Sequence, residues 1–128
     1  MARILVVDDD VIIREAVGRL LSRAGHEVDE AVNGKEAMSA LDAHSYQVVV
    51  TDINMPEMDG IEVIAALRRA RAGIPVVAMS GGGLMPKDLL LANADLMGAV
   101  EVIMKPFEAN QMVGAVERAL EASGDDSD

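Results

Sequence analysis

The chain has 128 residues, of which 51% are hydrophobic, and a formal net charge of −11. This length and apolar content describe one ordinary domain with enough material for a core. The negative charge argues against a nucleic-acid surface or an anionic membrane surface, because both need clustered lysine and arginine. The chain has no cysteine, which excludes disulfides and thiolate metal sites, so we expect a reducing, cytoplasmic location without a signal peptide.

Strand and helix patterns alternate along the first half of the chain. In order, the elements are a strand at 4–7, a helix at 11–24, a strand at 27–32, a helix at 33–43 and a strand at 47–51. Asp10 stands where the first helix needs an N-cap, and Gly25 is the residue type that ends such a helix. The strand at 27–32 is acidic, which predicts that it is half exposed and near an edge of the sheet.

The second half of the chain continues the same alternation. The predicted elements are a helix at 58–71, a strand at 75–79, a helix after Pro86, a strand at 100–104 and a final helix with Met112, Val113, Val116 and Leu120 on one stripe. Alternation of this kind predicts an α/β fold with helices on both faces of a parallel sheet. With five units, we expect a single doubly wound, flavodoxin-like domain with strand order 2-1-3-4-5.

The last six residues differ in composition from the rest of the chain. Residues 123–128 are small, polar and acidic. Such a segment has too few apolar side chains to offset the entropy of ordering. We therefore expect a domain at 1–122 and a disordered acidic tail at 123–128.

Polar residues follow four of the five predicted strands. They are Asp8, Asp9 and Asp10 after the first strand, Asp52 after the third, Ser80 after the fourth and Lys105 after the fifth. In a parallel sheet the carboxyl ends of the strands share one edge, and ligands bind there where the strand order reverses. These side chains, far apart in sequence, should therefore converge at one crevice.

Three carboxylates from Asp8, Asp9 and Asp52 in one crevice need cations. At an effective dielectric near 20, each pair about 5 Å apart repels by roughly 3 kcal/mol. Oxygen ligands without cysteine or histidine suit Mg²⁺ before Zn²⁺. With Mg²⁺ and the Lys105 ammonium, the site can admit a phosphoryl group, and a carboxylate can act as its nucleophile.

Three segments resemble the receiver domains of response regulators, the phosphoacceptor modules of two-component signalling. Residues 6–9 (VVDD), 51–60 (TDINMPEMDG) and 104–107 (MKPF) match their acidic, phosphoacceptor and lysine–proline segments, in the family's order. The resemblance covers residues 4–120, nearly the whole chain. Within the family, the chain resembles stand-alone receivers of the chemotaxis-regulator type. It implies a protein that takes a phosphoryl group from a sensor histidine kinase or a histidine phosphotransfer protein, with no catalysis beyond its own phosphorylation and dephosphorylation.

The resemblance also implies roles for individual residues. Asp52 would be the phosphoacceptor, and Lys105 and Ser80 would contact the phosphoryl group; Mg²⁺ would be held by Asp9, Asp52 and the backbone carbonyl of Asn54, with Asp8 bound through water. The bond before Pro106 would be cis, and Gly60 and Gly81 would support the adjacent loops. Asp10 is better explained as an N-cap than as a member of the site.

One departure from the family concerns the switch that follows phosphorylation. An aromatic residue is expected three positions before the lysine, and this chain has Val102 there. Coupling of the Ser80 hydroxyl to an aromatic rotation cannot operate in that form. We therefore expect switching to act through Ser80 and the helix after Pro86.

The output surface is expected on that helix, the strand at 100–104 and the final helix. Three consecutive leucines at 89–91 cannot all lie on one buried helical stripe, which suggests an exposed apolar patch for a partner or a second copy of the chain. Alternatively, the extra leucines pack under the loop at 81–86.

Two other functions remain open from sequence. A degenerate receiver would act as an interaction module without phosphorylation, and a Mg²⁺-dependent hydrolase would use the same aspartyl chemistry on a metabolite. The hydrolase would need a substrate pocket and a cap domain, for which the sequence has no room.

Overall fold

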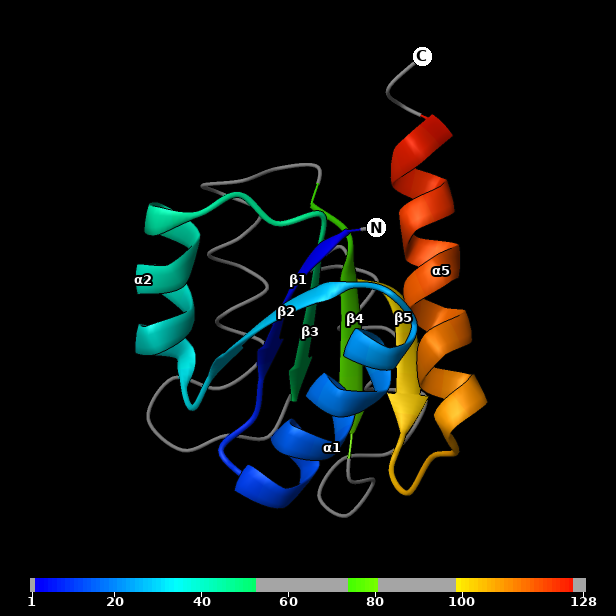
Figure 1. Ribbon diagram of the computed structural model, residues 1–128, viewed down its shortest axis with the longest axis horizontal. Coiled ribbons are helices and arrows are strands. Elements are labelled where there is room, and N and C mark those ends of the chain that lie inside the picture. The colour runs from blue at the N-terminus through cyan, green and yellow to red at the C-terminus, as the bar shows by residue number, and fades with distance from the viewer. Residues whose placement is uncertain (1, 53–73, 81–98, 126–128) are drawn as a thin grey trace.

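The computed structural model describes residues 2–52, 74–80 and 99–125. Five parallel strands form one sheet in the order β2-β1-β3-β4-β5, as the alternation of elements predicts (Figure 1). The strands are β1 (Arg3–Val7), β2 (Glu27–Ala31), β3 (Val48–Asp52), β4 (Val76–Ser80) and β5 (Ala99–Met104). Their carboxyl ends share the edge that is lowest in Figure 1.

The register of the sheet aligns the ends of the strands that carry the polar residues. Val7 on β1 pairs with Thr51 on β3, so that Asp8 and Asp52 follow at the same level of the sheet. On the other side of β3, Asp52 pairs with Met79 of β4. The final residue of β4 pairs with Met104, immediately before Lys105. The switch in strand order, between β1 and β3, therefore lies between the two buried acids.

Three helices are described: α1 (Val11–Arg23), α2 (Gly34–Ala43) and α5 (Ala109–Asp125). The signals at the ends of α1 are confirmed. The Asp10 side chain accepts hydrogen bonds from the backbone N–H groups of Ile12 and Ile13, and Gly25 adopts a φ of 97° that other residue types rarely accept. The Asp10 cap fixes where α1 begins beside the carboxyl edge of the sheet, and Gly25 marks where the helix ends.

The helix α5 runs further than the sequence predicts. It ends at Asp125 and so includes residues 123–125, which we expected to belong to a disordered tail. Adding a turn to an existing helix costs less than starting one, so the backbone ladder continues beyond the apolar stripe. The final residues, 126–128, lie outside the described part of the chain.

The sheet separates two apolar clusters, one on each face. Leu5 and Val7 of β1 pack on the α2 side with Ala37 and Leu41. Ile4 and Val6 point to the other face, which α1 and α5 cover. Alternate residues of one strand thus enter different clusters, and this two-sided burial explains why residues 4–7 of β1 and 48–50 of β3 are all apolar.

The helices expected at 58–71 and after Pro86 lie outside the described residues, as do Asn54, Gly60, Gly81 and the leucines at 89–91. Among the helices that are described, none combines the length and apolar character that crossing a bilayer requires.

Candidate functional site

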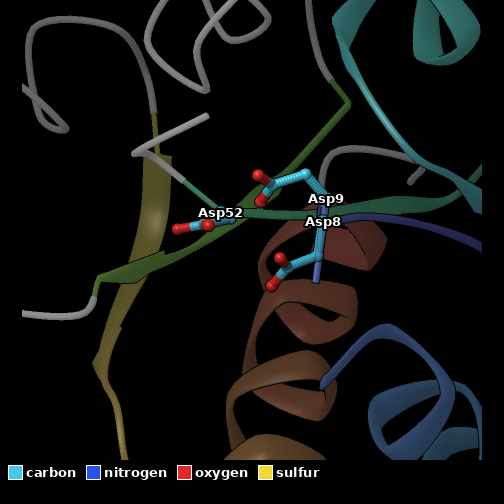
Figure 2. Close-up of side chains that lie close together, drawn as sticks. All are labelled: Asp8, Asp9 and Asp52. Atoms are coloured by element: carbon cyan, nitrogen blue, oxygen red, sulfur yellow. The ribbon is translucent and has the colours of Figure 1, made fainter. Parts of the chain in front are cut away.

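Three carboxylates meet at the carboxyl edge of the sheet, as the strand order predicts. Asp52 is the last residue of β3, and Asp8 and Asp9 directly follow β1. One oxygen from each carboxylate lies within 4.8 Å of the other two. Figure 2 shows the three side chains gathered at this point. Asp8 is 0% exposed and Asp52 is 5% exposed, whereas Asp9 is exposed to solvent.

Lys105 joins this group from the end of β5. Its Nζ lies 3.0 Å from Oδ2 of Asp8 and 3.4 Å from Oδ2 of Asp52. The lysine side chain is mostly buried, with 15% of its surface exposed. Among the described residues, one ammonium therefore stands against three carboxylates, two of them buried, which gives this group an excess of negative charge.

The donor set fits a hard divalent cation. Asp8, Asp9 and Asp52 offer carboxylate oxygens at a mutual spacing that one ion can bridge. Oxygen donors of this kind suit Mg²⁺, whose two positive charges, together with that of Lys105, would balance the three carboxylates. The residues present are therefore compatible with the ion that the sequence predicts.

Asp10 does not join the acid group, and the structure supports its interpretation as an N-cap. Its side chain serves the first turn of α1, while its backbone N–H donates to Oδ1 of Asp8 at 2.9 Å. The Asp8 backbone N–H in turn donates to the carbonyl of Ala31 at 3.1 Å. The turn after β1 is thus tied both to the helix and to β2.

The remaining predicted site residues are described in part. The peptide bond between Lys105 and Pro106 is cis, as the resemblance implies. Val102 is half-buried on β5 and packs against the cluster on the α2 face. Ser80 ends β4, as expected, and only its backbone is described.

Sequence reasoning missed Arg14, which lies on the first turns of α1. Its Nη1 donates to the backbone carbonyl of Asp8 at 2.8 Å, and its Nε donates to Oε1 of Glu30 at 3.0 Å. Helical side chains lean toward the N-terminus of their helix, so a long residue four positions after the N-cap can reach the preceding turn. That spacing was the available signal.

A second unpredicted cluster lies at the opposite edge of the sheet. The Tyr46 hydroxyl donates to Oδ2 of Asp29 at 2.6 Å, and the Arg3 guanidinium pairs with the same oxygen at 2.9 Å. The Tyr46 hydrogen bond, aided by Arg3, lowers the pKa of Asp29. Burial, reinforced by Asp29, raises the pKa of Tyr46 to about 12. This cluster is remote from the acids and supports the amino ends of β1 and β3.

The geometry defines a class: a doubly wound domain with a cluster of three carboxylates and a lysine at its switch point. Residues 4–117 match the response regulator receiver domain family. This chain therefore belongs to the response regulator receiver domain family of two-component signalling.

Individual relatives agree with that assignment. The chain is 34% identical over 119 residues to the chemotaxis protein CheY of Bacillus subtilis, which covers 92% of this chain and 97% of CheY. It is 33% identical to the transcriptional regulatory protein FixJ of Bradyrhizobium diazoefficiens, over 91% of this chain and 56% of FixJ. The chain thus spans about half the length of FixJ and nearly all of CheY.

Solved structures show the same fold. NtrX from Brucella abortus superposes with a TM-score of 0.89 at 35% identity, over 96% of this chain and 28% of NtrX. The chemotaxis protein CheY4 of Vibrio cholerae gives a TM-score of 0.86 at 30% identity, over 94% of this chain and 99% of CheY4.

Proposed function

We propose that the chain is a response-regulator receiver that accepts a phosphoryl group on Asp52 in a Mg²⁺-dependent reaction. The observation that supports this most strongly is the placement of Asp52 at the end of β3, near Asp8 and Asp9 and 3.4 Å from the Lys105 ammonium. A carboxylate so placed can act as a nucleophile. The donor is a sensor histidine kinase or a histidine phosphotransfer protein.

The transfer would proceed by attack of an Asp52 oxygen on phosphorus. An O–P bond forms as the N–P bond to the donor histidine breaks, and the imidazole nitrogen keeps the electron pair. Lys105 would stabilise the phosphoryl oxygens, because its Nζ already lies beside Asp52. Asp9, Asp52 and the Asn54 carbonyl would hold Mg²⁺, with Asp8 bound through water, and the ion would supply positive charge against the transferred group. The chain would catalyse only its own phosphorylation and dephosphorylation.

The donor protein must cover the surface around Asp52, and α1 offers an apolar surface there. Val11 and Ile12 are 49% and 77% exposed. Beside them, an apolar groove of about 460 Å³ extends from Ile12 to Phe107 and includes Lys105 in its lining. Because this groove shares Lys105 with the acid cluster, a protein that docks in it would bring a histidine close to Asp52. We assign this surface to the phosphodonor.

Phosphorylation would then change the surface formed by the helix after Pro86, β5 and α5, which binds a downstream protein or a second copy of the chain. Val102 on β5 is aliphatic, so the change would proceed through Ser80 without an aromatic rotation. Action in the cytoplasm follows from the proposed donors.

The degenerate receiver is the alternative function. It predicts that the acid cluster has no phosphoacceptor activity, although Asp8, Asp9, Asp52 and Lys105 are all present and brought together.

Incubation with a small phosphodonor and Mg²⁺, followed by mass spectrometry of the intact chain, distinguishes the phosphoacceptor from the degenerate receiver. We expect the addition of one phosphoryl group, and its complete loss in Asp52→Asn, which keeps the shape of the side chain but removes the nucleophilic charge. Omission of Mg²⁺ should also prevent the addition. An unmodified mass under all conditions would support the degenerate receiver, and full labelling of Asp52→Asn would refute Asp52 as the acceptor.

A further inference from the structure

Arg14 connects the acid cluster to the edge strand β2. Its guanidinium makes two hydrogen bonds in different directions, from Nη1 to the Asp8 carbonyl at 2.8 Å and from Nε to Glu30 at 3.0 Å. The Arg14 side chain is largely buried, with 12% of its surface exposed. Because the guanidinium is planar and two of its N–H donors are bonded in different directions, the Arg14 side chain is held in one orientation.

The carbonyl that Arg14 binds belongs to the peptide unit between Asp8 and Asp9. Because a peptide unit is planar, fixing its carbonyl also fixes the direction of its N–H and the position of the Asp9 Cα. Within the described part of the chain, the other bonds of this turn act elsewhere, since Asp8 donates its N–H to Ala31 and accepts from Asp10 at Oδ1. Arg14 therefore orients the peptide that joins the buried Asp8 to the exposed Asp9.

The fold makes room for Glu30, the residue that holds the Arg14 guanidinium in place. Glu30 lies on β2, and its carboxylate approaches α1 at Gly18, which is buried. A Cβ at Gly18 would lie 3.2 Å from Oε2 of Glu30, which is closer than ordinary van der Waals contact. The absence of a side chain at this position leaves room for the carboxylate beside the helix, where it meets the Arg14 guanidinium.

We propose that Arg14, anchored by Glu30, is a positioning residue that sets the Mg²⁺ affinity of the site by holding the Asp8–Asp9 peptide in its ligating orientation. This inference rests on the proposed Mg²⁺-dependent function. It assigns Arg14 no contact with the ion or the phosphoryl group.

If Arg14 acted only through its charge, its removal would change the Mg²⁺ affinity in the opposite direction. Arg14 is a cation near a cation site, so electrostatics alone predicts that its removal strengthens Mg²⁺ binding. If Arg14 acts by position, its removal weakens binding instead. The Arg14→Lys variant also distinguishes the charge effect from the positional effect. Lysine keeps the positive charge, but its single nitrogen cannot bind both the Asp8 carbonyl and Glu30.

The test is titration of Mg²⁺ by calorimetry into the unmodified chain, Arg14→Lys and Arg14→Gln, with thermal unfolding as the check that each is folded. We expect both variants to bind about tenfold more weakly, which is typical for partners that orient metal ligands. Amide chemical shifts of Asp9 and Asp10 should also differ from those of the unmodified chain before Mg²⁺ is added, since the peptide is no longer held.

Arg19→Gln is the matched control, because it removes the same charge from an exposed position on α1, and its affinity should be nearly unchanged. Affinity that is equal or higher in Arg14→Gln, or unchanged in Arg14→Lys, would overturn the inference and leave the proposed function intact. If the unmodified chain binds no Mg²⁺, the proposed function fails and the inference fails with it.

Discussion

Three consecutive acids, Asp8, Asp9 and Asp10, have three different environments. Asp8 is fully buried and paired with Lys105. Asp9 is exposed but aimed at the same point. Asp10 caps α1. Three residues of one chemical type in a row can therefore differ in function, because the chain turns from strand to helix within them.

The first prediction separates Asp9 from Asp10. Asp9→Asn should weaken Mg²⁺ binding by about tenfold or more, because a direct ligand should matter at least as much as the partners that orient it. Asp10→Asn should change the affinity much less, since the cap is not in the ligand group and asparagine caps equally well. Calorimetric Mg²⁺ titration of both variants measures the difference.

Asp10→Ala serves as the control for the cap. It should lower the free energy of unfolding by about 1 kcal/mol, measured in urea, because two backbone N–H groups of α1 lose their acceptor. Equal losses of Mg²⁺ affinity in Asp9→Asn and Asp10→Asn would contradict this division of roles.

At the residue scale, the sequence predicts which side chains the strand ends bring together, but it does not predict contacts that depend on a side-chain rotamer. The convergence of Asp8, Asp52 and Lys105 follows from the strand order alone. Arg14 could equally have extended into solvent, and only its rotamer brings it to the Asp8 carbonyl. His26 is half-buried, and its Nδ1 accepts the Ala2 N–H at 3.2 Å, a contact that no sequence pattern indicates.

At the scale of the element, α1 combines two roles on two faces. Val17 and Leu21 are buried against the sheet, while Val11 and Ile12 of the first turn remain exposed. An apolar side chain of this size gains roughly 1.5–3 kcal/mol when it is fully buried. The exposed first turn of α1 therefore offers a partner protein a substantial binding contribution, in a groove that Ile12 shares with Lys105 of the acid site.

The prediction for α1 concerns delivery of the phosphoryl group. Ile12→Glu should slow transfer from a kinase or phosphotransfer protein by about tenfold or more, because a charge replaces the apolar contact. Transfer from a small phosphodonor should be unaffected, since that donor needs no docking surface. Rates of phosphoryl transfer from both donors, measured side by side, test this expectation.

Ser39→Glu is a suitable control, because it adds the same charge at an exposed position of α2. Equal slowing with both donors would mean that Ile12→Glu damages the site itself. Unchanged transfer from the protein donor would place its docking surface elsewhere.

The bounds of the elements were largely predictable, because apolar periodicity and caps are local signals. Asp10 and Gly25 marked the ends of α1, and the strands differ from expectation by one or two residues. The end of α5 was not predictable, since the polar residues at 123–125 give no sign that the helix continues. The helices expected at 58–71 and after Pro86 stay predictions, and so does the output surface that depends on the second of them.

At the scale of the whole molecule, the two edges of the sheet have separate roles. The carboxyl edge gathers the acids, and the amino edge holds Arg3, Asp29 and Tyr46 in a network of hydrogen bonds. Arg3 also lies over the Tyr46 ring, 5.5 Å from its centroid. We expect this network to contribute to stability and not to phosphoryl transfer.

The alkaline stability of the domain should depend on Tyr46. Its pKa is raised to about 12 from a usual value of 10.0, so the unfolded chain releases the phenol proton first as the pH rises. The contribution is fully present below pH 10.0 and is lost as the pH rises toward about 12. Urea unfolding at several alkaline pH values should show this decline.

Tyr46→Phe is the control, because it should have a shallower decline over the same pH range. The chain has one tyrosine and no tryptophan, so phenolate absorbance reports Tyr46 directly. A phenolate midpoint near 10.0 in the folded chain would refute the raised pKa of Tyr46.

The unequal exposure of Asp8 and Asp9 has a kinetic consequence. Of the carboxylates that would hold a cation, Asp8 and Asp52 are buried and Asp9 faces solvent. Solvent could therefore reach the site from the Asp9 side while the sheet and α1 stay closed. Loading and release of the ion should therefore be fast compared with any opening of the fold, and a chelator should strip the site at a rate that does not follow the unfolding rate.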